Sequence, residues 1–195
     1  MGPKYDFLLK EYDQVSSAYF GLRTQISEWF KAYITMVALP LTVVAAVLKI
    51  GNDPEVDVFN LPSIIGLLLF FVAILGWLVC LTIISMRMEM IYYARVINTM
   101  RNYYSVRFPE ISKYLLLPKD SSNPPYYERL RVTHFQTLTF SIVDSLLFYF
   151  GIASLFDLTI IIMLFISSVF LLLHFVAYRA LAFYRECKDS KSSLI

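Results

Sequence analysis

Residues 61–86 read LPSIIGLLLFFVAILGWLVCLTIISM, and none of them is charged. A helix needs about 20 apolar residues to cross the hydrocarbon core of a bilayer, so this run is long enough to span one. Past this run the apolar residues recur at alternating steps of three and four, at Met90, Tyr93, Ile97, Met100 and Tyr104. The pattern stops before Pro109, because proline restricts the residue that precedes it. We therefore predict one helix over 62–107, whose first part, 62–86, is a transmembrane span.

Three more stretches, 32–50, 136–156 and 158–178, are apolar enough to span a membrane. The chain is 58% hydrophobic and 16% charged, whereas a typical soluble domain is about 25% charged. These features predict an all-α integral membrane protein with four transmembrane helices, built as a single membrane domain over residues 1–195. A re-entrant hairpin over 136–178, in place of the last two spans, is the alternative that the pattern leaves open.

The basic residues are distributed unevenly among the segments that connect the predicted spans. The loop over 51–62 holds three acids and no Lys or Arg, whereas 16 of the 17 basic residues fall in 1–31, 87–135 and 179–195. Because basic loops tend to stay in the cytoplasm, we predict that both termini and the middle segment are cytoplasmic. The middle segment is predicted as a helical extension followed by a loop, and 179–195 as a cytoplasmic tail whose last residues, 186–195, are polar and frayed.

The N-terminal segment carries a heptad pattern. Apolar residues alternate at steps of three and four, at Tyr5, Leu8, Tyr12, Val15, Tyr19, Leu22, Ile26, Trp29 and Tyr33. This is the spacing of a coiled-coil seam, and it predicts a helix over 1–31 that continues into the span at 32–50. We expect it to pack antiparallel against the extension of the helix over 62–107, as a cytoplasmic stalk. Two interpretations stay open: the seam is buried within one chain, or it also joins subunits of a homo-oligomer.

Asp144 lies inside the third predicted span. An acid near the centre of a bilayer costs about 2.5–3.5 kcal/mol on insertion scales. It shares one helical face with Thr137, Ser141 and Ser145, and such a polar stripe must face protein or water because lipid cannot satisfy it. His174 of the fourth span is within side-chain reach if the two faces match. The stripe either fixes helix packing by hydrogen bonds or lines a water-filled pore in an oligomer.

Small residues follow two other helical faces. One stripe lies in the span at 62–86, at Gly66, Ala73, Gly76 and Cys80, and the second in the span at 32–50, at Thr35, Ala38, Thr42 and Ala45. Small side chains allow helices to approach closely in a membrane. We predict that both stripes serve packing.

Arginines alternate with tyrosines in the predicted cytoplasmic segment. The six arginines considered for binding are Arg87, Arg95, Arg101, Arg107, Arg129 and Arg131. Interfacial tyrosines and arginines commonly anchor a protein at anionic lipid headgroups. The alternatives are a docking surface for a soluble cytoplasmic protein and, as a weaker interpretation, a nucleotide or nucleic-acid ligand.

Nothing in the sequence has the pattern of an active site. There is no glycine-rich phosphate loop, no nucleophile elbow and no pair of closely spaced cysteines. The two histidines lie 40 residues apart and offer too few ligands for a metal. We expect no enzyme activity, no cofactor and no metal site.

Three segments, LLKEYDQV, EWFKAYITMVALPLTVVAAVLK and ARVINTMRNYYSVRFPEISKYLLLP, resemble stretches of small bacterial four-span membrane proteins of unassigned role. Some proteins of this kind are similar to membrane components of anti-phage defence systems, such as the Kiwa membrane subunit. The resemblance covers about half of the chain and carries over no functional residue. It implies a multi-pass protein of the bacterial inner membrane, partnered by a soluble protein or a nucleotide signal, that acts during phage infection.

Two classes of function therefore compete. In the first, the chain is an oligomeric membrane effector or channel-like component with the polar stripe near its axis. In the second, it is a membrane anchor or sensor scaffold that recruits a soluble cytoplasmic effector through its stalk. An immunity protein against a membrane-targeting toxin is a third, weaker alternative.

Overall fold

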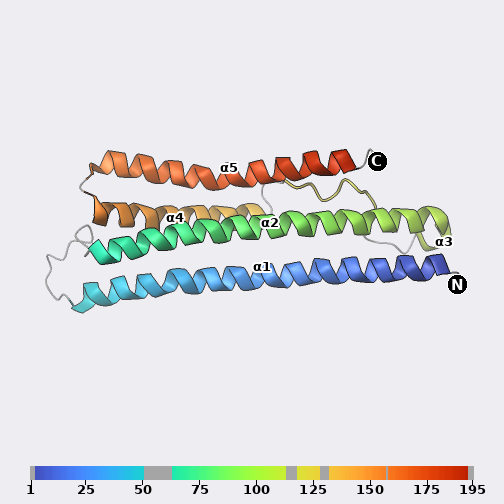
Figure 1. Cartoon of the computed structure of the whole chain (residues 1–195), viewed down its shortest axis with the longest axis horizontal. Helices are drawn as coiled ribbons and strands as arrows, with labels where there is room; N and C mark the ends of the chain where they lie inside the picture. The colour runs from blue at the N-terminus through green and yellow to red at the C-terminus, as the bar shows by residue number, and fades with distance from the viewer. Residues whose placement is uncertain (1–2, 51–62, 113–117, 128–131, 157, 193–195) are drawn as a thin grey trace. The chain divides into compact units, whose positions relative to one another are not determined.

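The structure is a computed structural model that describes residues 3–50, 63–112, 118–127, 132–156 and 158–192 (Figure 1). Within these ranges the chain forms five helices and no strand: α1 (Pro3–Ile50), α2 (Ser63–Arg107), α3 (Pro109–Ser112), α4 (Val132–Leu155) and α5 (Ile160–Ser192). Four of them, α1, α2, α4 and α5, are long and apolar enough to cross a membrane. The prediction of an all-helical chain with four such helices is confirmed.

The helix boundaries follow the sequence signals closely at most ends. α1 runs without a break from the heptad segment into the apolar stretch, and α2 ends at Arg107, before Pro109. The amide of Phe108 donates to the carbonyl of Tyr104 at 2.8 Å and so closes the last turn of α2. The exception is the segment 186–195, predicted as a frayed tail, because α5 continues to Ser192.

Contacts divide the chain into two compact units, which we describe separately. The extension unit comprises Met1–Ser27, Ser85–Glu128 and Leu181–Ile195, and the apolar unit comprises Glu28–Ile84 and Arg129–Ala180. Both chain ends belong to the extension unit. Parts of α1, α2, α4 and α5 form the apolar unit.

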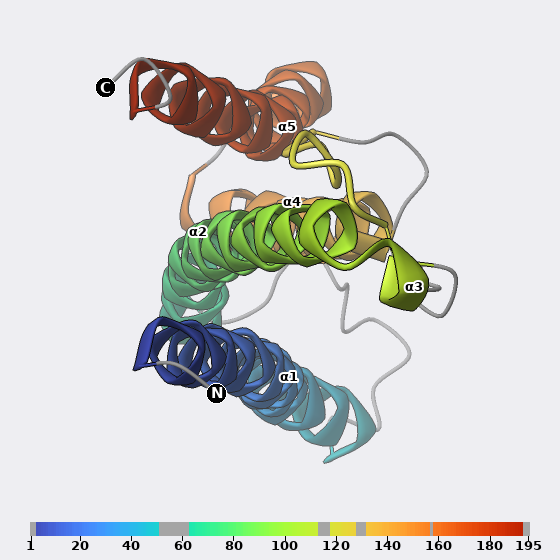
Figure 2. The same cartoon turned by 90° about the vertical axis from the view of Figure 1, so that its right-hand side faces the viewer.

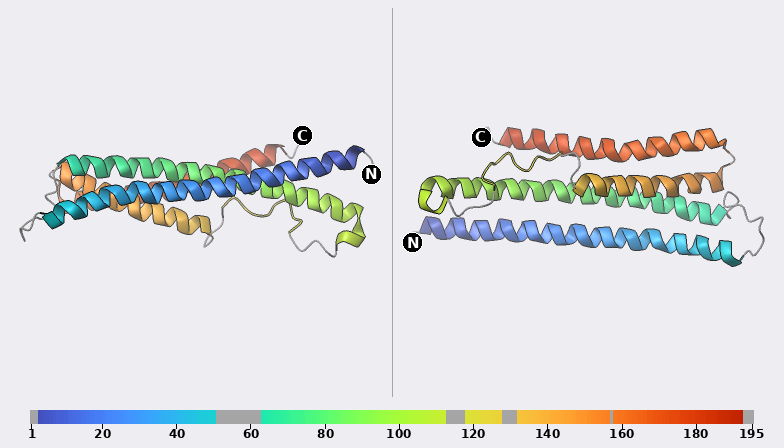
Figure 3. Two further views of the ribbon diagram at one scale, coloured as in Figure 1. Left: turned by 90° about the horizontal axis from the view of Figure 1, so that it is seen from below. Right: turned by 180° about the vertical axis from the view of Figure 1, so that it is seen from behind.

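In the apolar unit α2 packs closely on α4, and the two helices lie side by side in Figures 2 and 3. Glycines allow this approach. A Cβ atom built at Gly66 would lie 2.4 Å from Cβ of Ser154, and one at Gly151 would lie 2.8 Å from the backbone nitrogen of Phe70. The predicted small-residue stripe of α2 is buried, whereas the stripe of α1, at Thr35, Ala38, Thr42 and Ala45, is exposed on this chain.

In the extension unit the heptad seam of α1 faces inward. Val15 and Ile26 are buried, and the seam positions between and before them are half-buried, at Leu8, Tyr12, Tyr19 and Leu22. A guanidinium nitrogen of Arg101 in α2 donates to the hydroxyl of Tyr12 at 3.3 Å. The seam is thus used within one chain, as the first of the two interpretations expects. The side chain of Tyr5 lies outside the described residues, and Trp29, in the apolar unit, is exposed.

Candidate functional site

Asp144 lies near the midpoint of α4 with 0% of its side chain exposed. Both of its carboxyl oxygens are engaged. The hydroxyl of Tyr33 in α1 donates to Oδ1 at 2.9 Å, and Nε2 of His174 in α5 lies 3.1 Å from Oδ2. Burying an acid without hydrogen-bond partners would cost several kcal/mol, because each unpaired oxygen would lose its hydrogen bonds to water. Here α1 supplies the partner of Oδ1 and α5 supplies the partner of Oδ2.

α2 contributes space to this site. Gly76 lies against Asp144, and a Cβ atom at position 76 would lie 2.2 Å from Oδ1 and 2.7 Å from Cγ. No side chain larger than a hydrogen fits between α2 and the carboxyl group. We call Tyr33, Gly76, Asp144 and His174 the acid hub, since each of the four long helices supplies one of them.

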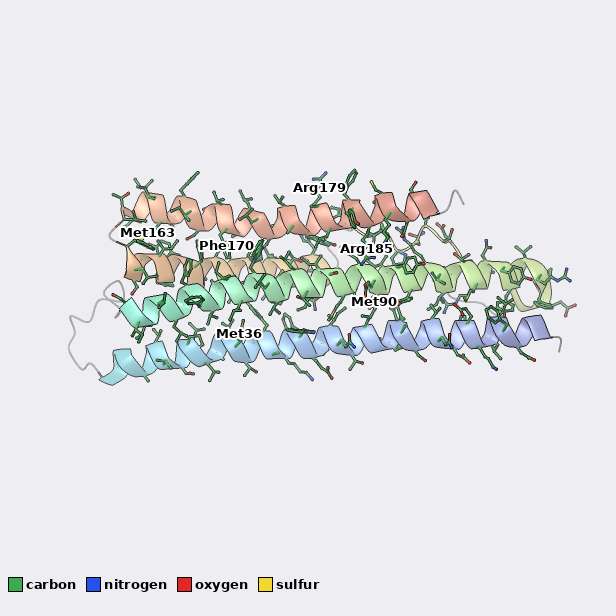
Figure 4. All side chains as sticks on the ribbon, in the orientation of Figure 1. Met36, Met90, Met163, Phe170, Arg179 and Arg185 are labelled. Carbon is green, nitrogen blue, oxygen red and sulfur yellow. The ribbon has the colours of Figure 1, made fainter. Side chains whose placement is uncertain are left out.

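Aromatic rings enclose the acid hub. The ring of Phe140 lies 4.1 Å from that of Tyr33, measured between centroids. On the other side Phe170 contacts His174 edge-on at 5.2 Å and stacks on Phe148 at 4.4 Å. Figure 4 shows Phe170 between α5 and α4. The rings help to bury the hub inside the chain.

The rest of the predicted polar stripe is also buried. Thr137 and Ser141 are 2% and 0% exposed, and the hydroxyl of Ser141 donates to the carbonyl of Leu138 at 2.9 Å. Ser145 is buried, and its hydroxyl has no hydrogen-bond partner among the described residues. The five predicted stripe residues, Thr137, Ser141, Asp144, Ser145 and His174, thus lie inside the chain and line no open path in it.

Tyr33 and Gly76 belong to the hub but were not among the candidate site residues. Tyr33 counts as an apolar position of the heptad seam, and Gly76 as one of several small packing residues. A signal for Gly76 exists in its position, since it interrupts a long charge-free run of large side chains. Tyr33 lies 111 residues from Asp144 in the sequence, a separation that helical periodicity does not bridge.

In the extension unit, Arg95 of α2 is not a free surface cation. Its side chain is 14% exposed, and its guanidinium lies 4.1 Å from the ring centre of Tyr126. Its Nε donates to the carbonyl of Pro124 at 3.0 Å. Its other nitrogens lie 3.5 Å from Asp189 and 3.7 Å from Glu186. The prediction that Arg95 meets headgroups or a partner needs correction, because these contacts occupy it inside the unit.

These contacts also explain the length of α5. Asp189 accepts hydrogen bonds from Arg95 and from the hydroxyl of Tyr126, and Arg185 lies 3.4 Å from Glu89 of α2. Figure 4 places Arg185 between α5 and α2. The polar C-terminal segment is therefore held as a helix by ion pairs, which its lack of apolar periodicity did not indicate.

The loop over 118–127 is bound to α2 in the same unit. The amide nitrogen of Asn98 donates to the carbonyls of Asp120 and Asn123, at 3.3 and 2.9 Å. Burial and the hydrogen bond to Asp189 raise the pKa of the Tyr126 phenol above its ordinary value of 10.0. Hydrogen bonds from Ser122 lower the pKa of Asp120.

The remaining predicted arginines differ in their surroundings. Arg101 is half-buried and bonds to Tyr12 and Asn98, and Arg87 approaches the sulfur of Met90 at 3.7 Å. Arg107, at the end of α2, is exposed. Arg129 and Arg131 lie outside the described residues. Among the arginines of this set that the structure describes, Arg107 is the exposed one.

Among the described residues, no three His, Cys, Asp or Glu side chains come together as a metal site. Cys80 is buried in the apolar unit and Cys187 is exposed in the extension unit. No protein-family profile, curated protein or solved structure matches this chain. The function must therefore be argued from the site and the two units.

Proposed function

We propose that the chain is a membrane-embedded scaffold that recruits a soluble partner. Its four long helices anchor it in a bilayer, and the extension unit projects on the cytoplasmic side of a bacterial inner membrane. The observation that carries this proposal is the closed acid hub. Asp144 is fully buried and both of its oxygens are bonded within one chain.

The closed hub weighs against the channel-like alternative. A residue that attracts ions into a pore must face water, whereas Asp144 faces Tyr33, His174 and aromatic rings. Opening a path along the stripe would require breaking contacts to two other helices. The hub is better suited to locking the helices of the anchor in one register.

The outer face of α2 supports the docking part of the proposal. Beyond the charge-free run, Tyr92, Val96, Thr99, Tyr103 and Val106 follow one another at steps of four and three. Tyr92, Tyr103 and Val106 are exposed, Val106 to 75%, although they lie past the predicted span. We call these five residues the outer stripe. A stripe of this spacing fits an amphipathic helix, and exposed Arg107 beside it favours a partner helix with acidic residues.

The distribution of charge supports the orientation. Both chain ends belong to the extension unit, as an even number of crossings requires, and the basic residues gather in its segments. The bilayer is then the first partner of the chain, and self-association through the exposed faces of α1 and α5 is part of the same proposal.

Site-specific photo-crosslinking tests the docking surface. A photoreactive amino acid at Thr99 is expected to give one protein adduct of defined mass in intact cells. Tyr103→Asp should abolish the adduct, whereas Asn102→Asp adds the same charge at an exposed neighbouring position and should leave it. Adducts to lipid alone, or adducts that survive Tyr103→Asp, would refute the outer stripe as a docking surface. An adduct to a second copy would replace the soluble partner by self-association.

Ion flux into liposomes tests the channel alternative. The purified full-length chain should conduct no ions, and Asp144→Asn should behave identically. A conductance that Asp144→Asn abolishes in assembled protein would overturn the scaffold. The anti-phage setting implied by the resemblance is tested by plaque counts, in which Tyr103→Asp should lose protection and Asn102→Asp should retain it.

A further inference from the structure

The imidazole of His174 is held between two oxygen atoms of different kinds. Its Nδ1 lies 3.0 Å from the backbone carbonyl of Phe170, and its Nε2 lies 3.1 Å from Oδ2 of Asp144. Both side chains are 0% exposed. A carbonyl oxygen can only accept a hydrogen bond. Nδ1 must therefore carry a hydrogen, and this fixes the tautomer of a neutral ring.

The fixed tautomer determines how many protons lie between His174 and Asp144. If the ring is neutral, Nε2 is bare and can only accept, so the hydrogen of this contact belongs to a protonated Asp144. If Asp144 is a carboxylate, Nε2 must donate, so the ring is an imidazolium. Each arrangement places one proton between Nε2 and Oδ2, and the net charge of the pair is zero in both.

We propose that His174 and Asp144 form a proton-binding site that holds one shared proton and stays electrically neutral inside the helix bundle. This inference goes beyond the scaffold function, which requires only that the hub be closed. Tyr33 completes the site, because its hydroxyl donates to Oδ1 and this bond is possible in both arrangements.

Gain or loss of a proton is costly at this site. A second proton would leave a positive charge buried among Phe140, Phe170 and Phe148. Removal of the shared proton would leave a negative charge and turn the lone pair of Nε2 toward a carboxylate oxygen. The other titratable groups facing the pair are the phenol of Tyr33 from α1 and the thiol of Cys80 from α2, both ordinarily uncharged. The site therefore resists both the gain and the loss of a proton.

Two spectroscopic measurements on the purified full-length chain count the proton. The chain has two histidines, so nitrogen NMR of protein labelled in its imidazoles gives two signals, and His134→Gln assigns them. His174 should have a protonated Nδ1, as its contact with the carbonyl of Phe170 requires. Infrared spectra with carboxyl-labelled aspartate report whether a protonated carboxyl group is present, without the need for a variant.

Of the four combined outcomes of the two measurements, two support the proposal and two contradict it. A neutral His174 with a protonated carboxyl, or an imidazolium without one, supports the shared proton. A neutral His174 without a protonated carboxyl, or an imidazolium with one, overturns it. A bare Nδ1 overturns it as well.

Variants at Asp144 give an independent test by unfolding temperature. Asp144→Asn keeps an oxygen for Tyr33 and presents an amide hydrogen to Nε2, so it should unfold within about 4 °C of the wild type. Leucine branches at Cγ as aspartate does but leaves both partners unpaired, so the unfolding temperature of Asp144→Leu should fall at least twice as far as that of Asp144→Asn. Equal losses for the two variants would show that charge, and not the neutral hydrogen-bonded pair, holds the hub together.

The variant His174→Gln removes the base that pairs with Asp144. In an unfolded chain an acid has lost its proton above about pH 4, whereas a histidine keeps its own up to about pH 6.5. The buried acid of the variant must carry its own proton, so the variant should become less stable as the pH rises from about 5 to 6, and the wild type should show no such trend over that range. A wild type and variant with the same dependence on pH would contradict the proposal. This outcome is independent of photo-crosslinking at the outer stripe, so the two proposals fail separately.

Discussion

Replacing Gly76 by alanine should destabilise the protein, although alanine is the better helix former. The added Cβ would lie 2.2 Å from Oδ1, 2.7 Å from Cγ and 2.9 Å from Oδ2 of Asp144. Carbon and oxygen atoms that are not bonded rarely approach so closely, so the carboxyl group must retreat by roughly 1 Å. The bonds to Tyr33 and His174, at 2.9 and 3.1 Å, would then exceed hydrogen-bonding distance.

The size of the effect follows from three contributions. Replacing glycine by alanine in a helix stabilises the folded protein by about 1 kcal/mol. Overpacking of a filled core costs about 1–3 kcal/mol, and each of the two strained hydrogen bonds is worth about 1 kcal/mol. The net expectation is a loss of about 2–4 kcal/mol.

Gly21 provides the matched control. It lies in the same kind of helix with nothing within 4 Å of an added Cβ, so Gly21→Ala should stabilise by about 0.5–1 kcal/mol. Unfolding of the purified protein in mixed micelles, followed by the fluorescence of its two tryptophans, measures both variants. A Gly76→Ala protein as stable as Gly21→Ala would refute the close approach of α2 to Asp144.

Three further outcomes are expected. Gly151→Ala should cost about 1–3 kcal/mol in the same unfolding assay, because its Cβ would lie 2.8 Å from a backbone atom, the nitrogen of Phe70, which cannot rotate away. Arg95→Lys loses the planar fork that reaches Pro124 and Asp189 together, so hydrogen exchange should accelerate in residues 118–127 and stay unchanged in α4. The raised pKa of Tyr126 means that the folded state favours the neutral phenol, so the contribution of Tyr126 to unfolding stability should be constant below about pH 9 and fall above it. The loss of unfolding stability above about pH 9 should be smaller in the Tyr126→Phe variant. An equal loss in both proteins would contradict the raised pKa of Tyr126.

Most helix boundaries could be predicted because local signals decide them. A charge-free run, alternating steps of three and four, and a proline after Phe108 each act over a few residues. The C-terminal extension of α5 carries no such signal. Its helix depends on Arg95, which pairs with Glu186 and Asp189 about 90 residues away in the sequence, and a pattern of apolar residues does not record ion pairs.

The candidate site was predicted in part for a similar reason. The cost of an acid in an apolar run marks Asp144 from its sequence alone, and antiparallel neighbours place His174 at a similar depth. Which other residues join the site depends on the rotation of each helix about its own axis. This rotation turns Tyr33 and Gly76 toward Asp144, and it turns Arg95 inward where a surface arginine was expected.

The acid hub sets an order for biosynthesis, because its members are made in the sequence Tyr33, Gly76, Asp144 and His174. A ribosome that has completed α4 has produced the acid, its phenol partner and the space for it, but not its base. Until α5 emerges, Oδ2 of Asp144 lacks its hydrogen-bond partner, His174. A product truncated before α5 would therefore keep the buried acid but lack the base that pairs with it.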